Sequence, residues 1–60
     1  MIPIIFTDMN KKRTMILPDK IVSIKEKESG TTITTVRGVL NASQDFDTVI
    51  NLYNDSMKHK

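Results

Sequence analysis

Residues 19–38, with the sequence DKIVSIKEKESGTTITTVRG, constrain the fold more than any other stretch. β-Branched residues lose little by being extended and pack well on a pleated surface, so residues 20–27 and 31–36 are predicted to be strands. Between them Glu28, Ser29 and Gly30 supply turn chemistry, because glycine tolerates positive φ and serine can bond to its own backbone. Two such runs with a short glycine-containing connection predict an antiparallel hairpin.

The first strand of this hairpin breaks strict alternation, because Ile21 and Ile24 are three residues apart. One interpretation places Val22 and Ile24 toward the core with Ile21 outside. The other is a β-bulge near Ser23 that resets the phase. We favour the bulge.

Two further strands are predicted before the hairpin, over residues 2–7 and 13–17. Asp8 and Asn10 mark the turn that joins them. Pro18 ends the second strand, because proline lacks an N–H and cannot continue a ladder. Residues 39–41 are long enough for a short fifth strand.

The tail changes period from two to about 3.6. Its apolar residues fall three and four apart on one helical stripe, with Leu52 at the flank: Phe46, Val49, Ile50, Tyr53 and Met57. Ser43 or Asp45 is the expected N-cap. So short a helix is marginal alone, so it must pack on the sheet. The prediction is a single α+β domain, residues 1–60, with a four- to five-stranded antiparallel sheet and one C-terminal helix packed on one face.

Size and composition narrow the function classes. The chain has 60 residues, no cysteine and one histidine, His59, next to the last residue. Disulfides and thiolate metal sites are therefore excluded, and a domain this small usually needs another stabiliser, here self-association or a protein partner. Met9, Met15 and Met57 are interpreted as adaptable core filler. We expect no enzyme activity, no cofactor or metal, and no small-molecule substrate.

No apolar stretch approaches the roughly 20 residues that a membrane span needs. The apolar start of the chain has neither the basic segment nor the small-residue cleavage site of a signal peptide. No membrane insertion is expected, and the predicted compartment is the cytoplasm.

The net charge of +2 indicates a mildly basic protein, whereas nucleic-acid binding normally shows as a clustered basic stripe. Lys11, Lys12 and Arg13 form the sharpest local cluster, and only Lys20 and Arg37 are available to extend it. This basic patch would contact phosphate in one interpretation. The favoured interpretation is a solubilising loop, since no aromatic stacking platform accompanies it.

A threonine-rich face is predicted on the strand at residues 31–36, where Thr32, Thr34 and Val36 share one side and Ile33 and Thr35 the other. A one-sided sheet usually turns such residues to water. In so small a chain they instead become a candidate interaction face for a second copy or another protein. An edge strand of this composition would also accept an added strand.

Four segments together resemble the small flagellar-operon proteins of the FlbD family: TDMNKK at 7–12, ILPDKIVSIKE at 16–26, TTITTVRG at 31–38 and DFDTVI at 45–50. The resemblance implies the same succession of strands, turns and a closing helix, together with an association with motility. It offers no catalytic residues to transfer.

The chain departs from the family pattern at four positions. Lys11 replaces the turn glycine, Thr35 replaces a core leucine, Arg37 replaces the asparagine before a glycine, and Asp45 stands in for the capping serine. The threonine suggests a thinner core or a different partner surface. We therefore expect a non-enzymatic protein-interaction module resembling FlbD-like proteins. A phage or mobile-element protein that modulates a host factor, and a weak nucleic-acid binder, are the alternatives.

Overall fold

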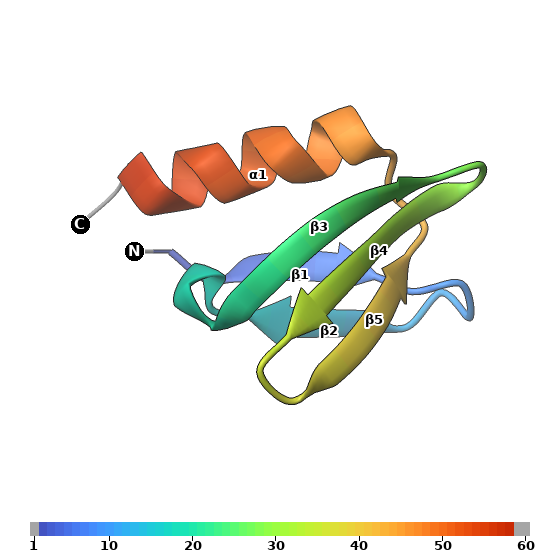
Figure 1. Ribbon diagram of the computed structural model, residues 1–60, viewed down its shortest axis with the longest axis horizontal. Coiled ribbons are helices and arrows are strands. Elements are labelled where there is room, and N and C mark those ends of the chain that lie inside the picture. Colours follow the sequence, from blue (N-terminus) through green and yellow to red (C-terminus); the bar gives the residue numbers. More distant parts are fainter. Residues whose placement is uncertain (1, 59–60) are drawn as a thin grey trace.

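The computed structural model describes residues 2–58, so His59 lies outside the described residues. In chain order the elements are β1 (Ile4–Thr7), β2 (Arg13–Ile16), the short 3-10 helix η1 (Pro18–Lys20), β3 (Ile21–Lys27), β4 (Gly30–Thr35), β5 (Gly38–Ala42) and α1 (Phe46–Lys58) (Figure 1). The α+β class with a C-terminal helix is confirmed.

The five strands form two antiparallel sheets, and the prediction of one continuous sheet was wrong. β1 pairs with β2, and β4 pairs with β3 and β5. The break falls at η1, where Pro18 cannot donate to a ladder and the N–H of Lys20 bonds to the carbonyl of Leu17 at 3.0 Å. This tight turn directs the chain from one layer to the other, with β1 and β2 behind the three-stranded sheet in Figure 1.

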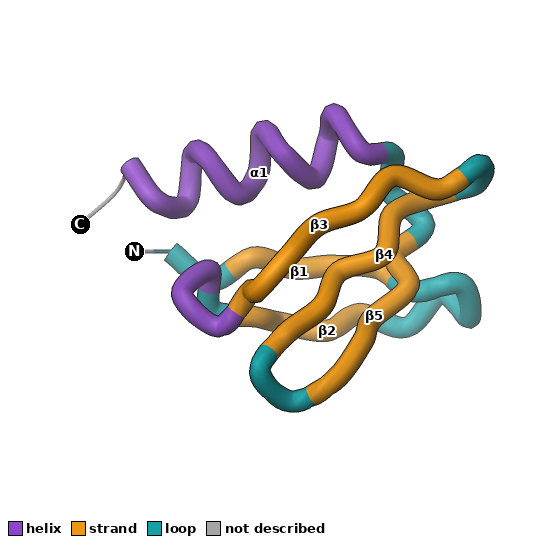
Figure 2. The backbone as a smooth tube through the Cα atoms, in the orientation of Figure 1, coloured by secondary structure: helices purple, strands orange, loops and turns teal. Residues whose placement is uncertain are grey.

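The core lies where the two sheets and the helix meet. Its buried apolar side chains are Ile4 and Phe6 from β1, Ile33 from β4, Ala42 from β5 and Val49 from α1. The helix contacts β1 in one sheet and β3 and β4 in the other. It therefore lies across both layers, along the side where β1 and β3 run (Figures 1 and 2), instead of covering one face of a single sheet.

The predicted bulge in β3 is confirmed. The register with β4 shifts between Ile21 and Ser23. As a result Ile21 and Ile24 both pack against the core, while Val22 is 66% exposed. The extra residue turns both isoleucines inward.

The turn between β3 and β4 requires a glycine, as its sequence indicated. Gly30 has φ of +108°, which side chains rarely adopt. A Cβ at this position would also overlap the backbone carbonyl oxygen of Ala42 on β5. Gly30, the first residue of β4, thus allows the start of this strand to approach β5 closely.

The helix begins at Phe46, as predicted, directly after Asp45. The carboxylate of Asp45 accepts a hydrogen bond from the Thr48 hydroxyl, and its carbonyl accepts the N–H of Val49 at 3.0 Å. Ser43, the other candidate cap, instead bonds to the carbonyl of Thr7.

The apolar stripe of α1 fits the prediction at Val49 but not at the last turn. Met57 is 46% exposed, whereas Ser56 is buried. The hydroxyl of Ser56 donates to the carbonyl of Ile2, and the N–H of Ile2 donates to the carbonyl of Ser56 at 3.3 Å. The start of the chain therefore docks on the end of the helix. Residue 2, which was expected in the first strand, precedes β1.

Candidate interaction surface

The threonine-rich face is present on β4 but is shorter than predicted. Thr32 and Thr34 are half-buried and alternate with buried Thr31 and Ile33. Val36 was wrongly placed on this strand, because it lies in the turn after β4.

Thr35 closes that turn and explains why β4 ends there. Its hydroxyl donates to the carbonyl of Gly38 at 3.0 Å and accepts the N–H of Arg37 at 3.2 Å. A side chain that bonds to nearby backbone favours a turn over a continuing strand.

β4 is the central strand of its sheet, so its backbone is already paired on both sides and cannot accept an added strand. Its outer face is also hydrogen-bonded within the sheet. The side-chain oxygen of Asn41 accepts the Thr32 hydroxyl at 3.1 Å and the Lys27 ammonium at 3.4 Å. This geometry is typical of a face turned to water.

The basic residues are divided into two groups. Lys11 and Lys12 lie in the turn after β1, and Arg13 begins β2. The Asp8 carboxylate organises this turn by accepting the N–H groups of Asn10 and Lys12, each at 2.9 Å. The hydrogen bonds of Asp8 therefore account for the shape of this turn without a bound ligand.

The second basic group consists of Lys20 in η1 and Arg37 in the β4–β5 turn. A backbone hydrogen bond of 3.0 Å from the Val36 N–H to the Lys20 carbonyl joins the two segments. Both residues line the same groove, and the group at residues 11–13 does not. The expected five-residue patch is therefore not continuous.

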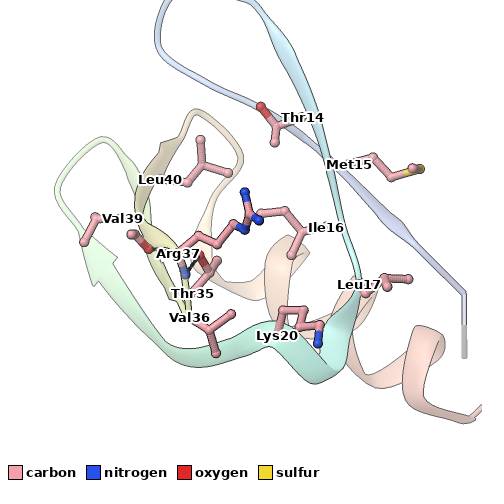
Figure 3. Close-up of a pocket in the computed structure, with 11 residues that line it drawn as sticks. Thr14, Met15, Ile16, Leu17, Lys20, Thr35, Val36, Arg37, Val39 and Leu40 are labelled. Atoms are coloured by element: carbon pink, nitrogen blue, oxygen red, sulfur yellow. Dashed lines mark hydrogen bonds between the residues drawn. The ribbon is translucent and has the colours of Figure 1, made fainter.

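The groove lies between β2 and the β4–β5 hairpin and has a volume of about 720 Å³. Thr14 and Ile16 form one wall, and Leu40 lies on the other (Figure 3). The Arg37 side chain extends from the turn toward Ile16. Met15 and Leu17 also line the groove, with the end of the Met15 side chain turned outward (Figure 3). Sequence reasoning missed this groove because it depends on how two separate hairpins diverge.

The outer face of the β1–β2 hairpin carries an exposed apolar pair. Ile5 lies opposite Met15 in the register, on the face away from the buried Ile4. Ile5 is 48% exposed and Met15 is 65% exposed, and Leu17 just beyond β2 is 44% exposed. We call Ile5, Met15 and Leu17 the hairpin patch. The interpretation of the methionines as core filler was wrong for Met15, as it was for Met9 and Met57, which are also exposed.

The two outer edges of this hairpin differ in their hydrogen bonding. Along β1, the Gln44 side-chain amide accepts the N–H of Thr7 at 3.0 Å and donates to the carbonyl of Ile5 at 3.3 Å. The N–H of Ser43 bonds to the carbonyl of Thr7 at 2.7 Å, next to a bridge between Asp8 and Ala42. Within residues 2–58, the outer edge of β2 has no such strand or amide beside it.

Comparison with protein-family models, curated proteins and solved structures finds no match. The likeness to flagellar FlbD-type proteins accordingly stays a prediction. Within residues 2–58, no group of three acidic, histidine or cysteine side chains is placed to hold a metal ion. In the same range, no helix is long and apolar enough to cross a bilayer.

Proposed function

We propose that this chain is a protein-interaction module that binds through the hairpin patch and the adjoining edge of β2. The observation that carries the proposal is the Ile5–Met15 pair, which projects from a sheet face beside an unpaired strand edge. Exposed apolar clusters of this kind mark sites of protein association. A free strand edge adds backbone hydrogen bonds to whatever covers the cluster.

The other strongly exposed valines lie elsewhere. Val22 is as exposed as Met15 but sits in the β3 bulge and does not line the groove, whereas Val36 and Val39 flank the β4–β5 turn and line the groove beside the patch. Isolated apolar residues on a surface are ordinary and need no partner. The hairpin patch differs because its members are neighbours on one face.

The module is proposed to be non-enzymatic and cytoplasmic, with another protein or a second copy of itself as partner. Freedom from cysteine is consistent with a reducing compartment. The resemblance to FlbD-like proteins favours a motility-associated partner. A phage-borne modulator of a host factor would use the same surface on a different target.

A matched pair of variants tests the proposal. Met15→Lys places a charge on the hairpin patch, whereas Val22→Lys places the same charge at an equally exposed site on β3. We expect Met15→Lys to abolish both self-association, measured by sedimentation from tens of micromolar to about 1 mM, and capture of specific partners from the native host. Val22→Lys should behave as the parent chain.

The proposal fails if the parent is monomeric and captures nothing specific, or if both variants retain binding. Circular dichroism of each variant establishes that a loss of binding is not a loss of fold.

A further inference from the structure

We infer that the groove between β2 and the β4–β5 hairpin binds an extended, acidic segment of a partner protein. This inference rests on the proposed function and extends it to the groove beside the hairpin patch, because Met15 and Leu17 of the patch also line the groove. It rests on the chemistry of the groove walls and on the strand edge beside them.

The positive charge of the groove lining favours an acidic ligand. Lys20 and Arg37 both line the groove, and none of its lining residues is acidic. The Arg37 side chain extends toward Ile16 (Figure 3), so its exposed guanidinium is directed toward the apolar wall of the groove. A carboxylate entering there would meet a planar donor that can bond to it through two N–H groups.

Apolar contacts select an occupant that also carries aliphatic side chains. Ile16 and Leu40 face each other across the groove, and both are only half-buried. In an extended segment, alternate side chains point the same way about 7 Å apart. Two aliphatic side chains on either side of a carboxylate would therefore fill the walls while the carboxylate meets Arg37.

Backbone pairing favours an extended conformation. Among residues 2–58, β2 pairs with β1 alone, and no ladder hydrogen bonds are made along its other edge. The corresponding edge of β1 is closed by Gln44. An added strand therefore has one side of this hairpin available, and that side adjoins the groove.

A nucleic acid fits this groove less well. The cations at Lys11, Lys12 and Arg13 lie outside the groove, so no continuous stripe follows a phosphate backbone. None of the lining residues is aromatic, so bases have no stacking platform.

The test uses the full chain labelled with ¹⁵N and a capped five-residue peptide, Val-Thr-Asp-Thr-Val. Its two valines and its aspartate share one face when it is extended. The matched peptide carries lysine in place of aspartate. We expect the acidic peptide to shift the backbone amide resonances of residues 14–17 and 35–40, with an affinity about tenfold higher than that of the lysine peptide.

Arg37→Glu should abolish this preference, because Lys20 remains and the two charges of the groove lining then cancel, while the walls stay in place. Arg37 is exposed in a turn, so the substitution is expected to leave the fold intact, and the amide spectrum of the variant verifies this. Val22→Lys, on β3 and outside the groove, should leave the peptide preference of the parent unchanged.

Three results overturn the inference: no amide shifts with either peptide up to millimolar concentration, shifts confined to other residues, or a preference for the acidic peptide that persists in Arg37→Glu. An oligothymidine of ten nucleotides is the third probe, and stronger shifts of the same amides by it than by the acidic peptide also overturn the inference. Failure of the proposed function would look different, because Met15→Lys would leave self-association and partner capture unaltered.

Discussion

Single residues with unusual backbone geometry fix the turns of this chain. Lys11 has φ of +65°, the left-handed conformation that favours glycine. Lys11 is thus a strained residue in an otherwise well-bonded turn, where its N–H donates to the carbonyl of Asp8 at 3.0 Å.

Lys11→Gly is therefore expected to stabilise the protein. Relief of the left-handed strain, about 1–2 kcal/mol, outweighs the additional flexibility of the unfolded chain, roughly 0.5–1 kcal/mol. Urea denaturation should give a free energy of unfolding higher by up to about 1 kcal/mol. Lys12→Gly, next to it but without positive φ, should be neutral or destabilising, and equal gains from both variants would contradict this explanation.

Alanine substitutions at Gly30 and Gly38 distinguish the free-energy cost of backbone strain from the cost of steric overlap. Both have positive φ, but a Cβ at Gly38 meets no atom within 4 Å, whereas one at Gly30 overlaps the Ala42 carbonyl. Gly38→Ala should cost about 1 kcal/mol and Gly30→Ala clearly more, because β4 must also move away from β5. Thermal and urea denaturation measure both. Equal losses would show that the close approach of β4 and β5 is unimportant.

At the scale of elements, the outer edge of β1 is hydrogen-bonded by the side chain of Gln44 in place of a neighbouring strand. The Gln44 amide both accepts from and donates to β1, as a paired strand would. Gln44→Glu keeps the acceptor for Thr7 but removes the donor to Ile5, so two oxygens would face each other.

We expect Gln44→Glu to lower the free energy of unfolding by about 1–3 kcal/mol and to raise amide hydrogen exchange at Thr7. Asp45→Asn, the adjacent control, keeps a capping side chain and should cost little. A Gln44→Glu variant with parental stability and exchange would contradict the assigned role.

Local features of these elements were predictable, and long-range ones were not. The bulge near Ser23 follows from the spacing of two isoleucines, and the helix start at Phe46 follows from a change of period. By contrast, the bonds of Gln44 join residues 37 and 39 positions apart. The division into two sheets likewise depends on the direction in which η1 turns the backbone. No local pattern encodes either of these.

The candidate site shows the same limit. Sequence patterning correctly put Thr32 and Thr34 on one face, but it could not show that β4 is central and therefore closed to strand addition. It found Lys20 and Arg37 as charges without placing them on one groove. Met15 was misassigned because its face is set by pairing with Ile5.

At the scale of the whole molecule, binding through the hairpin patch and binding at Arg37 in the groove should respond differently to salt. Contacts through the hairpin patch are apolar and insensitive to screening, whereas peptide binding at Arg37 depends on charge. Raising sodium chloride from about 0.05 M to about 0.5 M should leave self-association or partner binding unchanged and weaken the acidic peptide several-fold. Sedimentation and peptide titration at both salt concentrations check this, and the opposite pattern would contradict the assignment of the two surfaces.

The most direct measurement of whether this protein acts through the hairpin patch is photocrosslinking in the native host. A photoreactive benzoylphenylalanine replaces Met15 in one variant and Val22 in the other. We predict a discrete covalent adduct, either with one partner protein or with a second copy, from position 15 and none from position 22. Equal labelling from both positions, or no adduct from position 15, would contradict the account.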